Sequence, residues 1–265
     1  FTSVPAVNSL VELVRDQPEI KEILDLPFTD YHFWAAAFSA TDWTNFIDPS
    51  GNGLIPAKRD DIYREVYDLT AYLLETYSGT GKTFYVSNWE GDWKLAGPNY
   101  REDPTQIPAE RIAAQIDWAN ARQRAVDDAK AATPHANVNV WYCLEANKMD
   151  WAREDLPCVV NSVIPEMPKL DFISFSSYSL HKDGPSTAPL ERMHADLDTL
   201  QGLIDAKEDP TIPGSRLIIG EYGYQHQNGD YPDFETFALE HALALRNYLS
   251  WQGGTLRFIL QWQFF

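Results

Sequence analysis

The chain has 265 residues, of which 44% are hydrophobic and 23% charged, and these values exclude a disordered or collagen-like protein. Asp and Glu number 39 against 21 Lys and Arg, so the net charge of −18 disfavours nucleic acids and anionic membranes as partners. No run approaches the roughly 18 apolar residues of a membrane span, residues 1–10 lack the features of a signal peptide, and extracellular and cytoplasmic locations both stay open.

Apolar runs typical of buried strands alternate with amphipathic helical patterns, which indicates βα units around a parallel sheet. An amphipathic segment at residues 10–26 is predicted to form the helix that precedes the first strand. Strands are predicted within residues 30–41 (a strand and its exit loop), 83–88, 138–144, 171–177, 216–220 and 256–261. Helices are predicted between them at residues 60–77, 108–134, 158–163, 190–204 and 233–251, and Asp233 caps the last one.

Six strands are fewer than the eight of a closed (β/α)8 TIM barrel. The count therefore predicts an α/β fold in which strands three to eight are present and the first two βα units lie upstream of Phe1. No Gly/Ser or Pro tract divides the sequence. We accordingly expect one catalytic barrel domain over residues 1–265, incomplete at its N-terminus.

Carboxylates follow two of the predicted strands, Glu90 after residues 83–88 and Glu221 after residues 216–220. Because the carboxyl ends of parallel strands meet at one edge of the sheet, both are expected in one cleft. The other candidates for contact with a substrate there are Asn88, Trp89, Asp92, Trp93, Glu145, Asn147, Tyr178 and Trp262, with His32 in the first strand. Together they form an acidic, amide-rich and aromatic site.

Paired carboxyl groups across a cleft are what cleavage of a glycosidic bond requires. Glu221 directly follows four apolar strand residues, where a carboxylate without a task would be costly to bury. Glu90 stands between Trp89 and Trp93, whose apolar surroundings favour a raised pKa and a role as general acid. The histidines form no metal-binding pair, so neither a metal nor a cofactor is expected.

The segments FYVSNWEGDW, LIIGEYGY and FILQWQ resemble the retaining glycoside hydrolases of the large (β/α)8-barrel clan. The resemblance extends from about Asp30 to Phe265. In that clan the acid/base Glu follows strand four and the nucleophile Glu follows strand seven. With two strands upstream, the resemblance implies that Glu90 is the acid/base and Glu221 the nucleophile, and that the substrate is an oligo- or polysaccharide.

The same resemblance implies roles for three further residues. In the clan an Asn stands directly before the acid/base Glu and contacts the sugar, whereas Asn88 stands two residues before Glu90. Tyr178 matches a strand-six residue that touches the nucleophile, and Trp262 matches the tryptophan that forms the floor of the sugar site. Two alternatives stay open, a catalytically silent carbohydrate-binding barrel and an inverting glycosidase.

Overall fold

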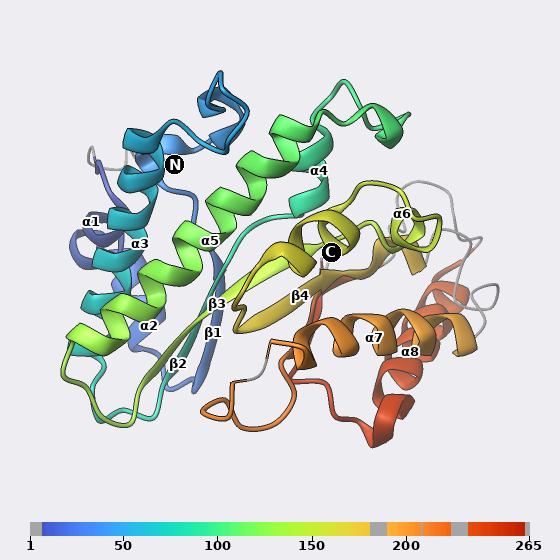
Figure 1. Ribbon diagram of the computed structural model, residues 1–265. Coiled ribbons are helices and arrows are strands. Elements are labelled where there is room, and N and C mark those ends of the chain that lie inside the picture. Colours follow the sequence, from blue (N-terminus) through green and yellow to red (C-terminus); the bar gives the residue numbers. More distant parts are fainter. Residues whose placement is uncertain (1–6, 181–189, 208, 224–232, 263–265) are drawn as a thin grey trace. The chain divides into compact units, whose positions relative to one another are not determined.

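The computed structural model describes residues 7–180, 190–207, 209–223 and 233–262 (Figure 1). Six parallel strands alternate with helices, and the sheet follows chain order from β1 to β6 and curls into a half-barrel. The predicted α/β class and the six strands are thus confirmed. Tyr224 of the LIIGEYGY segment lies outside the described residues. None of the described helices is both long and apolar enough to cross a membrane.

Contacts between residues divide the chain into two compact units. The first comprises residues 1–89 and 106–144, and the second residues 90–105 and 145–265. Short helical turns connect the main elements of the chain at Phe38–Ala40, Trp43–Phe46, Pro104–Gln106, Ile164–Glu166, Ser177–Leu180 and Trp251–Gly253.

The first unit contains the strands and long helices of the first half of the chain. Its elements are α1 (Leu10–Asp16), α2 (Pro18–Asp25), β1 (Asp30–Trp34), α3 (Pro56–Thr76), β2 (Thr83–Ser87), α5 (Ala109–Ala132) and most of β3 (Asn139–Ala146). Strands β1 and β2 pair in parallel from Asp30 with Thr83 to Trp34 with Ser87. The helices α3 and α5 lie side by side (Figure 1).

Two helix boundaries in the first unit differ from the predicted ones. The segment at 10–26 forms two helices, because Pro18 disfavours helical backbone in the preceding residue and Gln17 is extended, with φ −93° and ψ 111°. Helix α3 begins earlier than expected, at Pro56, whose fixed φ suits the first helical position. The apolar face predicted for α3 is confirmed, since Ile62 and Leu73 are fully buried.

The second unit contains the remaining strands and several short helices. Its elements are α4 (Gly91–Ala96), α6 (Met149–Arg153), a π-helical turn (Val159–Val163), β4 (Phe172–Ser176), α7 (Leu190–Asp205), β5 (Leu217–Tyr222), α8 (Phe234–Ser250) and β6 (Ile259–Gln261). Helix α7 packs on β4 and β5 through Met193, Leu197 and Leu200, which are fully buried. Leu190, the first residue of α7, is 43% exposed.

The register of β4 and β5 shifts just before Glu221. Phe175 pairs with Ile219 and Ser176 pairs with Glu221, so Gly220 is an extra residue in β5. Such a bulge bends a strand and changes the direction of the side chains that follow it. The bulge therefore sets the direction in which the Glu221 side chain leaves the sheet.

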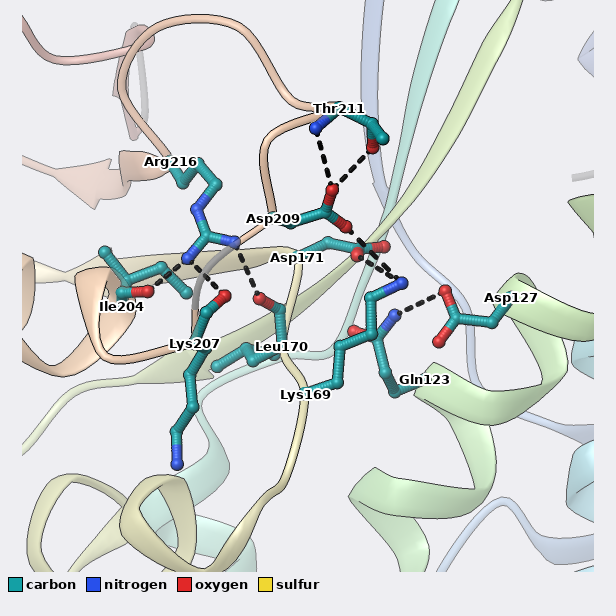
Figure 2. A network of polar contacts seen from close by, with 10 residues as sticks. All are labelled: Gln123, Asp127, Lys169, Leu170, Asp171, Ile204, Lys207, Asp209, Thr211 and Arg216. Carbon is teal, nitrogen blue, oxygen red and sulfur yellow. Dashed lines mark hydrogen bonds and ion pairs between the residues drawn. The ribbon is translucent and has the colours of Figure 1, made fainter.

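Charged side chains form hydrogen bonds and ion pairs at the amino ends of β4 and β5, the ends opposite to Glu221 (Figure 2). The Arg216 guanidinium, at the start of β5, donates hydrogen bonds to the carbonyls of Leu170, Ile204 and Lys207. Lys169 lies 3.4 Å from Asp209 and 3.9 Å from the buried Asp171. The charges at this end of the strands thus have structural partners.

A buried cation joins the carboxyl ends of β1 and β2 in the first unit. The fully buried Arg122 of α5 donates to the carbonyl oxygens of Ala35, at 2.7 Å, and of Ser87, at 3.0 Å. Its guanidinium also lies 4.8 Å from the ring centre of Trp118. Arg122 thus satisfies backbone groups at the point where the chain leaves both strands.

Replacing Arg122 by Leu should destabilise the protein, because the buried Ala35 carbonyl loses the donor that Arg122 supplies, whereas the Ser87 carbonyl keeps the Ala35 N–H as a donor. We expect the free energy of unfolding to fall by about 1–3 kcal/mol, the cost of one buried carbonyl left without a partner. Urea unfolding followed by circular dichroism measures the change. Arg124→Leu, at an exposed position of the same helix, is the matched control, and an equal loss in both variants would contradict the assigned role.

Candidate active site

Glu221 lies near the end of β5, with 3% of its surface exposed. Its Oε2 accepts a hydrogen bond of 2.8 Å from the Tyr178 hydroxyl. Its Oε1 is buried and accepts no hydrogen bond from the described residues. The carboxylate is thus held by one oxygen while the other keeps its bonding capacity.

Glu90 stands immediately before α4 in an uncommon backbone conformation. Its φ is 27° and its ψ 78°, and positive φ is disfavoured for a residue with a Cβ atom. Its N–H donates a hydrogen bond of 2.8 Å to Oε1 of Glu145. Only 7% of Glu90 is exposed. The backbone of Glu90, the predicted acid, is thus strained and buried, and its N–H is bound by Glu145.

Burial raises the pKa of Glu90 to about 7, and the nearby carboxylates of Glu221 and Asp92 act in the same direction. A hydrogen bond with Trp93 and the charge of Arg101 act against the rise. At neutral pH the Glu90 carboxyl therefore exchanges between its protonated and ionised forms. That state suits a group that first donates and later accepts a proton.

Burial also raises the pKa of Glu221, while the Tyr178 hydroxyl lowers it by bonding to the ionised carboxylate. The pKa of Tyr178 itself is raised by burial, by its bond to Glu221 and by the charges of Glu221, Glu90 and Glu145. The phenol therefore stays protonated and remains a donor. This contact favours the ionised form of Glu221.

A third carboxyl group, Glu145, lies near the end of β3 and is fully buried. Its Oε1 accepts from the Glu90 amide and from the Ser176 hydroxyl, and its Oε2 accepts from the Ser174 hydroxyl. Burial raises its pKa to about 8, and the charge of Glu221 adds to the rise. Its predicted contact with a sugar stays untested, but its known partners are all protein groups.

The two serines were not predicted as part of the site. Ser174 and Ser176 are two residues apart in β4, so both side chains point to the same face of the strand. The segment DFISFSS contains this alternation of apolar and hydroxyl residues. The pattern could have indicated a polar contact, although not which residue accepts it.

Asp92 and Asn147, both predicted substrate contacts, bond to each other and to the backbone. Asp92 is fully buried, and its oxygens accept from the backbone N–H groups of Asn147, Lys148 and Val159 at 2.7, 3.1 and 2.6 Å. Its own N–H donates to Oδ1 of Asn147. In the structure Asp92 is therefore buried and holds the first turn of α4 in place, and its contact with a substrate stays a prediction.

Aromatic and cationic side chains gather around α4 and α6. The rings of Trp93 and Trp151 lie 6.1 Å apart, edge to face. Arg101 and Lys148 lie 4.9 and 5.2 Å from the ring centre of Trp93. Trp93 thus connects this cluster to the Glu90 carboxyl, with which it forms a hydrogen bond.

The remaining candidates keep their status as predictions. Trp262 is 47% exposed, and its backbone N–H donates to the Tyr222 carbonyl. Asn88, Trp89 and His32 belong to the first unit, where Trp89 is 44% exposed and burial lowers the pKa of His32 to about 4. Among the described residues, no three His, Cys, Asp or Glu side chains form a group that could hold a metal ion.

Tyr178→Phe should raise the pKa of Glu221, because it removes the hydroxyl that stabilises the ionised carboxylate. A ¹³C NMR titration of the glutamate carboxyl carbons measures the shift. Tyr63→Phe is the matched control, since the Tyr63 hydroxyl donates to Asp128 within the first unit. A Glu221 pKa unchanged or lowered by Tyr178→Phe would contradict this account of the pair.

Comparison with protein-family models gave no match to this chain. Comparison with curated proteins gave none either. The chemistry of the site therefore has to be inferred from its own carboxyl groups, their partners and their surroundings.

Proposed function

We propose that the protein is a retaining O-glycoside hydrolase that acts on an oligo- or polysaccharide. The observation that carries this proposal is the unequal pair of buried carboxyl groups, Glu90 and Glu221, which belong to one unit of the structure and in which the charge of Glu221 helps to raise the pKa of Glu90. A pair in which one group keeps a proton near pH 7 and the other accepts a hydrogen bond that favours its anion supplies the two functions that glycosidic cleavage needs.

In this proposal Glu90 is the general acid. Its raised pKa keeps a proton available near neutral pH, and that proton passes to the oxygen of the departing sugar as the glycosidic bond breaks. Glu221 attacks the anomeric carbon and forms a glycosyl ester. Its Oε1, which accepts no bond from the described residues, is the natural attacking atom, and Tyr178 holds Oε2.

The second half of the reaction reverses the proton transfer. Glu90, now ionised, takes a proton from water, and the resulting hydroxide attacks the anomeric carbon and releases Glu221. Two inversions at the same carbon give a product with retained configuration. A carboxyl separation of about 5 to 5.5 Å accompanies this mechanism, whereas about 6.5 Å or more accompanies inversion.

The architecture supports the same proposal. In parallel βα folds, reactive groups gather at the carboxyl ends of the strands, and Glu145 and Glu221 lie near the ends of β3 and β5. We propose that the six strands correspond to strands three to eight of a (β/α)8 barrel. Glu90 then follows the fourth barrel strand and Glu221 lies at the end of the seventh.

Glu221→Gln should abolish turnover, with a loss of at least about 10⁴-fold in kcat, because an amide cannot form the glycosyl ester. A panel of aryl glycosides and polysaccharides measures the activity, and circular dichroism checks the fold. Glu154→Gln, at an exposed position of the same unit, is the matched control. Full activity of Glu221→Gln would remove Glu221 as nucleophile, and glycan affinity without hydrolysis by the wild type would favour the binding alternative.

The pH dependence of kcat/KM should follow the two carboxyl groups. Activity should fall as the pH rises through about 7, because the acid Glu90 then loses its proton. It should also fall at low pH, because protonation of Glu221 removes the nucleophile. Glu90→Gln should eliminate the high-pH limb for a substrate with an activated leaving group, and a limb that persists unchanged in this variant would assign it to another group.

A further inference from the structure

Glu90 has a backbone conformation that requires stabilisation by the rest of the fold. A left-handed conformation at φ 27° is unfavourable for glutamate, and the next residue, Gly91, already begins α4. A local sequence of this kind does not by itself select such a conformation. A contact from elsewhere in the fold has to stabilise it, and the hydrogen bond from the Glu90 N–H to Glu145 is such a contact.

The Glu145 carboxyl is itself held in place by β4, and β5 leaves space for it. Ser174 and Ser176 of β4 each donate to one of its oxygens, both at 3.0 Å. On the β5 side, a Cβ atom on Gly220 would lie 2.8 Å from Oε2 of Glu145 and even closer to Ser174. Glycine at the bulge is therefore what gives the carboxyl its space, and the same bulge precedes Glu221.

We propose that Glu145 is a positioning residue, whose carboxyl holds the Glu90 backbone in its left-handed conformation and so directs the Glu90 side chain toward the bond to be cleaved. This inference rests on the proposed function. It differs from a direct role for Glu145, because its two oxygens accept from three protein donors and none of its surface is exposed.

The proposal makes the hydrogen-bond acceptor the essential feature of Glu145, and its charge secondary. Burial raises its pKa to about 8 and the charge of Glu221 adds to the rise, while the hydrogen bonds from the Glu90 N–H and from the Ser174 and Ser176 hydroxyls act against it. A protonated carboxyl can still accept the Glu90 N–H at Oε1 while its Oε2 hydroxyl bonds to Ser174. Glutamine offers the same acceptor and donor, whereas leucine has a similar size and offers neither.

The first test needs no catalytic activity. In Glu145→Leu the amide proton of Glu90 should shift upfield in ¹H–¹⁵N NMR spectra, because it loses a hydrogen bond to a carboxyl oxygen. In Glu145→Gln the shift should stay close to that of the wild type. Glu154→Gln is the exposed control in the same unit. An unchanged Glu90 amide in Glu145→Leu would overturn the proposal.

The second test separates positioning of the acid from a general structural effect. Glu145→Leu should lower kcat/KM about 100-fold for a phenyl glycoside, which needs a proton on its leaving group. The loss should stay below about tenfold for the 2,4-dinitrophenyl glycoside of the same sugar, which does not need one. Glu145→Gln should retain both activities within about tenfold. Equal losses on both substrates in Glu145→Leu would overturn the proposal.

The two tests also distinguish this inference from the proposed function. If the wild type hydrolyses no glycoside while the Glu90 amide still responds to Glu145→Leu, the contact stands and the proposed function fails. If Glu145→Leu does not fold, the double variant Ser174→Ala and Ser176→Ala frees the carboxyl with less disruption. It should give a smaller upfield shift of the Glu90 amide proton and a smaller loss of activity on the phenyl glycoside. An unaffected Glu90 amide in the double variant would overturn the proposal.

Discussion

The hydrogen bond from the Glu90 amide to the buried Glu145 carboxyl connects the start of α4 to the end of β3. It stabilises a backbone conformation that glutamate rarely adopts. A second connection lies two residues further on, where Asp92 accepts three backbone N–H groups. The buried carboxylates of Glu145 and Asp92 therefore fix the position of the short helix α4 and of the Glu90 backbone that precedes it.

Burying several carboxyl groups together has an electrostatic consequence. Burial raises the pKa values of Glu90, Glu145 and Glu221, and the charge of Glu221 adds to the rise at Glu90 and at Glu145. Their partners then make them unequal. Glu221 bonds to a phenol that favours its anion, and Glu90 is among the groups that oppose ionisation of that phenol. The fold thus places chemically identical groups in different surroundings, which is the usual basis for separate acid and nucleophile roles.

Periodicity predicted the six strands because each is a short apolar run between turn residues, and the long helices because their apolar faces repeat. It did not predict α4 and α6, which are too short to show a helical repeat. The break at Gln17 carried a local signal in Pro18, but the apolar pattern on both sides of it favoured one helix. The sequence therefore favoured one helix over this segment, and only the structure showed that Pro18 divides it into two.

The sequence by itself determined the fold class and located Glu90 and Glu221, because strand exits can be recognised from local patterns and parallel strands place their exits at one edge. Only the tertiary structure decided what each polar residue at those exits does. In the sequence Asp92 and Glu145 are both acidic residues that follow predicted strands. In the structure Asp92 accepts backbone N–H groups at the start of α4, whereas Glu145 accepts the Glu90 N–H. Those roles depend on partners up to 67 residues away, and such hydrogen bonds leave no trace in local spacing.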